Sequence, residues 1–564
     1  MRSSNNAMRQ LRAPRALTNT TSMSVVRILS KIAFALLVLA ATAFSSRASA
    51  SAVYIGQSNA GNADGSSCAN QFAASFFNSG SNWGSGGSQI GPGTTVHLCG
   101  TITTALVAQG SGSSSGTVTL QWEQGASLAV CNNVGALQLT TKSYFTVDLG
   151  GNSAAITCPN NGTGLGSGVG AVGIGANGNW MSHIEIRNGT IGPLYKYSCC
   201  GSDGLNSVSI SLFGGTNNHF HDLTLINANG GISFQLGNNI SSSGNEINNN
   251  NCASTIGRCV DYSNGDGSSV TDTAGKIHDN DITFGDGWYS GGGDYTHLES
   301  IRSFNYGGPN SNDHIVGELI YNNYIHGQST GDATSFIFIP EGLSSCSSNS
   351  TLSAKIFNNL MVLTGGGGPG DGFIFTQDCE HTLEIYNNTI DGMNNSQMIC
   401  MEIEGSQTTV TIKNNICENV QTMIYNAHSG PTIVASNNDY YNVGKSGSNG
   451  WYWQGQEYET LAAWQSATGQ DANSVTTNPG LASNYTMPSG SAVAGMGVNL
   501  TSLSTSTLDE SKPASEGPGA ESASVVARAS TGGWDPGAYA TGQVSSTPPP
   551  TLAPPTGLAV VSVQ

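Results

Sequence analysis

LEIYNNTIDG, residues 383–392, joins a short run of alternating apolar and polar residues to a pair of asparagines and a turn. The two-residue period of Leu383 and Ile385 is typical of a short β-strand. Close relatives of the phrase recur as AKIFNNLMVL (354–363), VTIKNNICEN (410–419), LIYNNYIHG (319–327), KIHDNDITF (276–284) and NEINNNNC (245–252). The Asn-Asn or Asp-Asn pairs begin at residues 249, 279, 322, 358, 387, 414 and 437, which gives intervals of 23 to 43 residues.

One phrase per interval, always in the same register, predicts a solenoid in which equivalent residues of successive turns stack. In such a stack Leu383 and Ile385 belong to aliphatic ladders of the core, and Asn387 and Asn388 mark the bend that follows. Asparagine amides at this bend can bond one another and the turn backbone, which satisfies groups that are otherwise buried without partners. Antiparallel hairpins of a sandwich are the alternative, but they do not explain the common register.

The repeats occur together with GPGTTVHLCGTIT (91–103), TMPSGSAVAGMGVNL (486–500) and DPGAYA (535–540). With these segments, residues 53–540 resemble the right-handed parallel β-helix, or pectate-lyase-like, superfamily. The resemblance implies an all-β fold, a right-handed parallel β-helix solenoid with an N-terminal cap and an irregular C-terminal extension. It does not select an activity, because hydrolases, lyases, epimerases and non-catalytic adhesins share this scaffold.

The first fifty residues differ from the rest of the chain. They contain seven basic and no acidic residues, a thirteen-residue apolar run at 32–44, and Ala48-Ser49-Ala50. This pattern predicts a secretory signal peptide (1–50) that is cleaved near Ala50, and hence a secreted, extracellular or cell-surface protein. An uncleaved anchor is the alternative, although the run is shorter than the about 20 residues of a membrane span.

The remaining sequence is divided by composition. We expect an N-terminal cap and first coil at 51–105, the parallel β-helix at 106–445, a C-terminal cap or extension at 446–540, and a Pro-rich tail at 541–564. Within the extension, YETLAAWQSATG (458–469) predicts a short helix with Thr460 as its N-cap and Gly469 as its stop.

Charge and cysteine content limit the partners and the compartment. Without residues 1–50 the chain has 11 basic and 36 acidic residues, a net charge of −25. This charge repels nucleic acid and anionic lipid, so a neutral extracellular polysaccharide is the expected partner of a monomeric protein without a membrane span. The twelve cysteines predict disulfides rather than zinc ligands, because no C-x-x-C or H-x-x-x-H spacing is present. The plausible pairs are Cys68–Cys99, Cys131–Cys158, Cys252–Cys259, Cys346–Cys379 and Cys400–Cys417, with the adjacent Cys199 and Cys200 left over.

Acidic and histidine side chains concentrate between residues 258 and 341, in the middle of the predicted solenoid. Here GGGDYTHLESIRSF (291–304) places Asp294, His297, Glu299 and Arg302 within about ten residues, which could supply a general acid, a general base and a charge stabiliser. The stretch from His297 loosely resembles an H-x-D-G-I segment of some β-helix carbohydrate enzymes, with Glu299 and Ser300 in place of Asp and Gly. Strict alternation separates Glu299 from Arg302 unless the strand bends near Ser300.

The next repeat adds His326, which follows His297 by 29 residues, and Glu341, which follows a strand end. The candidate catalytic residues are therefore Asp294, Glu299 and Glu341 as acid or base, assisted by His297, Arg302 and His326. Each has a structural alternative: His326 can cap a turn, Glu341 can bond turn amides, and Arg302 can pair with an aspartate.

Two carboxylates that flank a glycosidic bond suit hydrolysis. A β-elimination lyase instead needs a base and a cation that neutralises a uronate, and Ca²⁺ is the candidate cofactor. DYSNGDGSSVTD (261–272) offers oxygen ligands, although it lacks the closing Glu of an EF-hand and also reads as a metal-free turn. The leading hypothesis is a glycoside hydrolase or polysaccharide lyase. The alternative is a non-catalytic surface or matrix protein that binds glycans or mediates adhesion.

Overall fold

The computed structural model divides the chain into two units, Met1–Ala50 and Ser51–Gln564. It describes residues 51–87, 89–158, 171–176, 181–194, 207–236, 241–254, 256–264, 271–285, 298–304, 314–329, 333–340, 351–377, 381–393, 397–405, 409–444, 450–503, 510–511, 525–541 and 544–545. The predicted signal peptide and most of the Pro-rich tail lie outside this part of the chain. Within it, no helix has the length and apolar character needed to cross a membrane.

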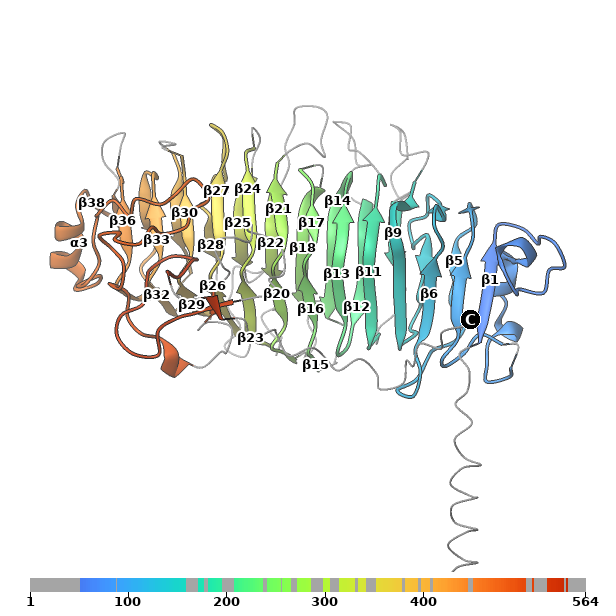
Figure 1. The fold of residues 1–564 in the computed structure, drawn as a ribbon. Helices are drawn as coiled ribbons and strands as arrows, with labels where there is room; N and C mark the ends of the chain where they lie inside the picture. The colour runs from blue at the N-terminus through green and yellow to red at the C-terminus, as the bar shows by residue number, and fades with distance from the viewer. Residues whose placement is uncertain are drawn as a thin grey trace, which may run out of the picture. The chain divides into compact units, whose positions relative to one another are not determined.

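The described residues form an all-β fold that is dominated by two long parallel sheets (Figure 1). Sheet A has 25 strands: β1 (Ala52–Gly56), β2 (Phe72–Ala73), β3 (Thr95–Leu98), β4 (Thr101–Ile102), β6 (Val118–Trp122), β7 (Ser127–Ala129), β9 (Phe145–Thr157), β11 (Ile184–Ile191), β13 (His219–Leu225), β15 (Ser242–Ser243), β16 (Glu246–Asn248), β17 (Asn251–Cys252), β19 (Thr271–Thr273), β20 (Lys276–His278), β21 (Asp281–Phe284), β23 (His314–Tyr321), β24 (Tyr324–Gly327), β26 (Thr351–Phe357), β27 (Leu360–Leu363), β29 (His381–Tyr386), β30 (Thr389–Asp391), β32 (Thr409–Lys413), β33 (Ile416–Glu418), β35 (Thr432–Ser436) and β36 (Asp439–Tyr441).

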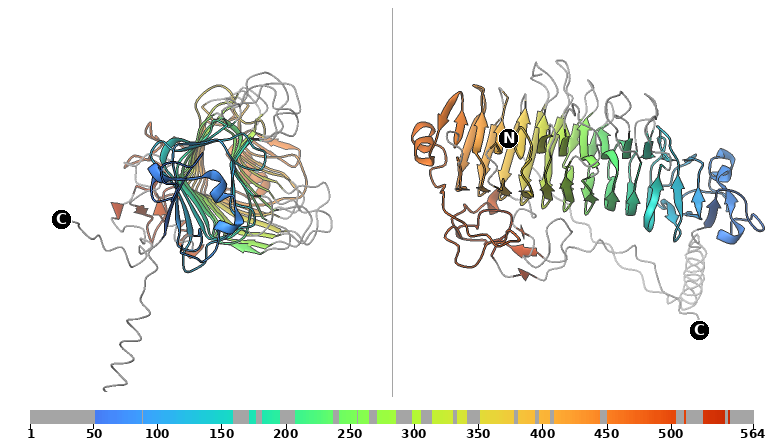
Figure 2. Two further views of the ribbon diagram at one scale, coloured as in Figure 1. Left: turned by 90° about the vertical axis from the view of Figure 1, so that its right-hand side faces the viewer. Right: turned by 90° about the horizontal axis from the view of Figure 1, so that it is seen from above.

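Sheet B has 13 strands, and all but the last pair in parallel. They are β5 (Leu106–Val107), β8 (Leu137–Gln138), β10 (Ala171–Gly175), β12 (Ser207–Gly214), β14 (Ala228–Leu236), β18 (Ile256–Asn264), β22 (Leu298–Phe304), β25 (Ala333–Pro340), β28 (Ile374–Gln377), β31 (Ile399–Ile403), β34 (Thr422–Asn426), β37 (Trp451–Trp453) and β38 (Gln456–Tyr458). From β5 onward the chain visits sheet B once for each visit to sheet A, and each strand pairs with its counterpart one repeat later. Strands of successive repeats therefore superpose when the stack is viewed end-on (Figure 2, left).

Aliphatic side chains fill the space between the sheets. Leu383 and Ile385 of β29 are fully buried and lie in register with Val410 and Ile412 of β32, as the repeated phrase predicts. Each such side chain contributes about 1.5–3 kcal/mol on burial, and the two-residue period directs the intervening residues to the outer face.

The second asparagine of each phrase forms a continuous buried ladder. Each side-chain amide donates to the side-chain oxygen one repeat later, at 2.9–3.1 Å, through Asn250, Asn280, Asn323, Asn359, Asn388, Asn415, Asn438 and finally Asp471. The residue before each of the seven asparagines has a left-handed backbone, as at Asn387 with φ of 51°, a conformation that asparagine and aspartate tolerate well. The ladder expected at the bend is confirmed.

The four described disulfides and the helix that begins after Thr460 agree with the predictions from the sequence. Bonds join Cys68 to Cys99, Cys131 to Cys158, Cys252 to Cys259 and Cys400 to Cys417. The other four cysteines lie outside the described residues. Helix α3 (Leu461–Thr468) begins after Thr460, whose hydroxyl accepts from the Ala463 amide at 3.2 Å, and ends at Gly469 with φ of 71°. The N-terminal segment holds β1, β2 and the short helix α2 (Ala74–Phe77).

The C-terminal segment packs on the outer face of the later strands of sheet A (Figures 1 and 2). Leu500 and Trp534 pack in one buried cluster with Tyr321, Phe357 and Tyr386, and the rings of Tyr321 and Phe357 stack at 4.9 Å. The first asparagines of the phrases hold its backbone: Asn387 donates to the Asp535 carbonyl at 2.9 Å, and Asn414 to the Val498 carbonyl at 2.8 Å.

Candidate functional site

One row of side chains crosses the outer face of sheet B, one residue per strand. The register aligns Ser211, Ser233, Asp261, Arg302, Phe338, Phe375, Glu402, Tyr425 and Tyr452. The sequence neighbours Ile337, Ile374 and Met401 belong to the hydrophobic core, whereas the row residues do not. Because side chains alternate along a strand, the row faces away from the core. Residues 100 positions apart in sequence, Arg302 and Glu402, thus lie three strands apart.

The first part of the row is a network of ion pairs. Arg302 binds both carboxylate oxygens of Asp261, at 3.0 Å from Nε and 2.7 Å from Nη2. Arg258 binds Glu299 at 2.6 Å through Nη2 and approaches Asp261 at 3.5 Å. The Glu299 carboxylate is fully buried. These bonds connect four side chains of β18 and β22 into one network.

The structure brings two of the six predicted catalytic residues together. Glu299 and Arg302 join the same network through Arg258 and Asp261. The pairing of β22 with β25 is regular from Glu299 to Arg302, because its one register shift lies between Leu298 and Glu299. The long Arg258 side chain, rather than a bend at Ser300, therefore connects the two residues.

Of the other four candidates, the structure describes His326 alone. His326 lies on β24 of sheet A, where Nε2 bonds Asp281 at 2.9 Å and the ring stacks on Tyr324 at 4.1 Å. It is therefore on a different sheet from Glu299 and Arg302. Asp294, His297 and Glu341 lie outside the described residues.

The next polar group of the row is Glu402, on β31. Its side chain is almost fully buried, at 7% exposure. Burial and the negative charges of Asp371 and Glu404 raise its pKa to about 9. Glu404 also shares a hydrogen bond with it, and His428 lies 3.5 Å from Glu404. Glu402 therefore keeps its proton at neutral pH and can donate it to a substrate.

Aromatic rings flank Glu402 on both sides within the row. Phe338 and Phe375 stack at 4.9 Å and 11°, and both are 4% exposed. Tyr425 and Tyr452 stack at 4.8 Å and 13°, and both are half-buried. The row therefore places a carboxyl with a raised pKa beside two partly exposed tyrosines, whose rings are apolar and whose hydroxyl ends are polar.

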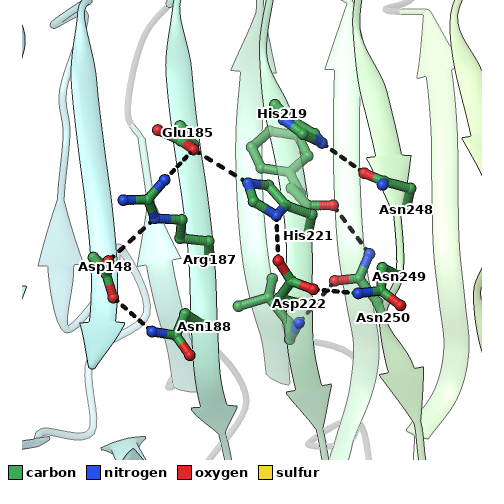
Figure 3. Close-up of polar contacts among 12 residues, drawn as sticks. Asp148, Glu185, Arg187, Asn188, His219, His221, Asp222, Asn248, Asn249 and Asn250 are labelled. Carbon is green, nitrogen blue, oxygen red and sulfur yellow. Dashed lines mark hydrogen bonds and ion pairs between the residues drawn. The ribbon is translucent and has the colours of Figure 1, made fainter. Parts of the chain in front are cut away.

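A second polar cluster lies on the outer face of the earlier strands of sheet A (Figure 3). His221 bridges Asp222, at 2.7 Å, and Glu185 on the preceding strand β11, at 3.2 Å. Arg187 bonds Glu185 at 2.7 Å and Asp148 on β9 at 3.1 Å. The same motif recurs two strands later, where His278 bridges Asp279 at 2.6 Å and Glu246 at 2.7 Å.

These bonds fix the protonation states in the cluster. Burial lowers the pKa of His221 and of His278, but the hydrogen bonds to two carboxylates outweigh it, so that both pKa values are raised. The hydrogen bond from His221 lowers the pKa of Glu185 to about 2, and that from His278 lowers the pKa of Glu246 to about 2. Because each imidazole is engaged at both nitrogens, we interpret this cluster as a lock between neighbouring strands rather than as a catalytic centre.

Of the aspartates in the stretch considered for calcium, the structure describes Asp261 and Asp272, and these two lie in different environments. Asp261 binds Arg302 on the outer face, whereas Asp272 is buried and accepts a hydrogen bond from the Tyr262 hydroxyl at 2.8 Å. Among the described residues no group of three or more His, Cys, Asp or Glu side chains is arranged to hold a metal ion.

Glu402, Asp371 and Glu404 are not among the candidates predicted from the sequence. A signal for two of them was present, because the E-x-E spacing in MEIEG (401–405) places both glutamates on one face of a strand. No protein-family model and no curated protein matches the chain. The site therefore has to be interpreted from its own chemistry.

Proposed function

We propose that this chain is a secreted right-handed parallel β-helix of the pectate-lyase-like kind, and that it hydrolyses a neutral extracellular polysaccharide on the outer face of sheet B. The parallel register, the asparagine ladder and the alternation of the chain between the two sheets support a β-helix. The four disulfides support an oxidising compartment.

The raised pKa of the buried Glu402 is the observation that best supports hydrolysis. With a pKa of about 9, Glu402 is the general acid that protonates the glycosidic oxygen, and Glu404 shares its proton in the resting site. Asp371, from the segment before β28, is the second carboxylate of the pair, which activates water or attacks the anomeric carbon. Glycoside hydrolysis needs one carboxyl that donates a proton and a second that acts as base or nucleophile, and we assign these two roles to Glu402 and Asp371.

The ion pairs of the two arginines near the row favour hydrolysis over β-elimination. A lyase needs a cation that neutralises a uronate carboxylate, but Arg302 is held by Asp261 and Arg258 by Glu299. The carboxylates around Glu402 would also repel a uronate.

The test is an assay of product release from xylan, β-glucan, mannan, galactan and polygalacturonate by wild type, E402Q and D371N. We expect reducing ends without unsaturated products, and a loss of about 10²–10⁴-fold in kcat for E402Q. The matched control is E123Q, which alters a glutamate bonded to His97 on sheet A and should retain activity. Full activity of E402Q, or an unsaturated product, would refute the proposal. Binding without cleavage by wild type would instead support the glycan-binding alternative.

A further inference from the structure

Two tyrosines follow Glu402 directly in the row on sheet B. Tyr425 is in register with Glu402 on the adjacent strand, and Tyr452 is in register with Tyr425 on the next. Their rings are nearly parallel, at 13° and 4.8 Å between centroids. Stacked in this way along the row, the rings cover much of each other's faces and leave their edges and hydroxyl groups for contact with a ligand.

The hydroxyl groups are suited to a polar ligand. Both residues are half-buried, and in the described part of the chain neither hydroxyl makes a hydrogen bond to protein. Burial and the nearby Glu402 raise the pKa of Tyr425, so that its hydroxyl stays protonated and can donate as well as accept.

The charges around the pair select the type of sugar. Glu402, Asp371 and Glu404 supply three carboxyl groups, and the imidazole of His428 lies 3.5 Å from Glu404. A uronate carboxylate placed here would meet carboxylates of the same sign. Neutral sugar hydroxyls, which donate and accept, match both the carboxylates and the tyrosine hydroxyls.

The register of the row also indicates the direction in which a bound glycan chain would run. Adjacent strands lie about 4.8 Å apart, which is close to the length of one sugar unit. A glycan that crosses the strands can therefore place one unit over each of three successive row residues. We infer that Tyr425 and Tyr452 are specificity-determining residues, whose hydroxyls bind two consecutive neutral sugar units next to the bond at Glu402.

This inference rests on the proposed function, and the test separates the two. Y425F, Y452F and the double variant remove only the hydroxyls and preserve the stacked rings. We expect each single change to raise KM about 3- to 10-fold on the neutral polysaccharide that wild type cleaves, with little change in kcat, because one hydrogen bond to a neutral group is lost. In the E402Q background, the same changes should weaken retardation in affinity electrophoresis on that polysaccharide.

The matched control is Y54F, since Tyr54 stacks on His97 at 4.3 Å on sheet A and should change neither readout. Unchanged KM and unchanged retardation in the double variant would overturn the inference, even if E402Q abolishes cleavage. So would stronger retardation of wild type by polygalacturonate than by every neutral glycan, or no retardation by any glycan. Full activity of E402Q would instead overturn the proposed function.

Discussion

Replacing His278 tests whether the histidine lock on sheet A stabilises the fold in the way that its geometry indicates. His278 is 5% exposed, and both of its nitrogens bond carboxylates, Asp279 at 2.6 Å and Glu246 at 2.7 Å. His278→Gln keeps a polar side chain but removes the cation. Glu246 and the 6% exposed Asp279 then lose their main counter-charge.

The expected loss in free energy of unfolding can be worked out from the pKa of Glu246. Its pKa falls from 4.5 to about 2, with the His278 hydrogen bond as the largest cause. A change of about 2.5 pKa units corresponds to about 3.4 kcal/mol at 1.36 kcal/mol per unit. Glu246 is 30% exposed and also interacts with Lys276, and solvent screening reduces the figure. We expect His278→Gln to lower the free energy of unfolding by about 2 kcal/mol near pH 5.5.

The pH dependence gives the sharper test. The raised pKa of His278 means that its contribution is complete below the unfolded value of 6.5 and is lost as pH rises through the folded value. The lowered pKa of Glu246 means that its contribution is complete above 4.5 and is lost as pH falls toward about 2. The difference between wild type and variant should therefore be largest between about pH 4.5 and 6.5 and should shrink on both sides.

Chemical unfolding monitored by circular dichroism at pH 3, 5.5 and 9 measures this difference. Other groups titrate in the same range, but they are common to both proteins and cancel in the comparison. His97→Gln is the control, because His97 bonds only one carboxylate, that of the 40% exposed Glu123, and its loss should cost less than about 1 kcal/mol. A destabilisation by His278→Gln that is equal at pH 5.5 and pH 9 would show that packing, not charge, explains the role of this residue.

Three further outcomes follow from the same contacts. If Glu402 acts as the acid, kcat/KM should decline as pH rises through about 9, and an E402D variant should move that limb, whereas a limb unchanged in E402D would assign it to another group. Asn388→Ala removes hydrogen bonds to Asn415 and to the Ile356 carbonyl, so it should cost about 2–3 kcal/mol in chemical unfolding, against less than about 0.5 kcal/mol for the exposed Asn484→Ala. Burial raises the pKa of Asp439 from 3.8 to about 8, so its free-energy cost to folding grows as pH rises from about 4 to about 8 and is constant above; Asp439→Asn should raise the melting temperature more at pH 9 than at pH 5, and an equal change at both would contradict the assignment.

Local chemistry made the repeats predictable from sequence. The alternation in LEIYNNTIDG, the asparagine pair and the Thr460 cap are encoded within a few residues, and the four described disulfides join cysteines that are neighbours along the chain. The site was harder to predict, because its residues come together through register. Arg302 and Glu402 share one row although 100 residues separate them, and the distance depends on how many strands intervene. His326 follows His297 by about one repeat, but sequence spacing alone did not show that β24 belongs to the other sheet.

The bend residue before the asparagine ladder shows how one repeated position is used for two purposes. In the later repeats Asn387 and Asn414 occupy it, and their amides hold the C-terminal segment. In two of the earlier repeats, on either side of Asn249, aspartates occupy the equivalent left-handed position, and Asp222 and Asp279 instead accept from the histidine that precedes them. Both amide and carboxylate side chains tolerate the left-handed backbone, so the fold is preserved. The outer face differs along sheet A: the C-terminal segment covers the later strands, and ion pairs connect the earlier strands. The pH sensitivity that comes from histidine is therefore expected in the earlier strands of sheet A, whereas that of Asp439 arises from a buried carboxyl on its last strand, β36.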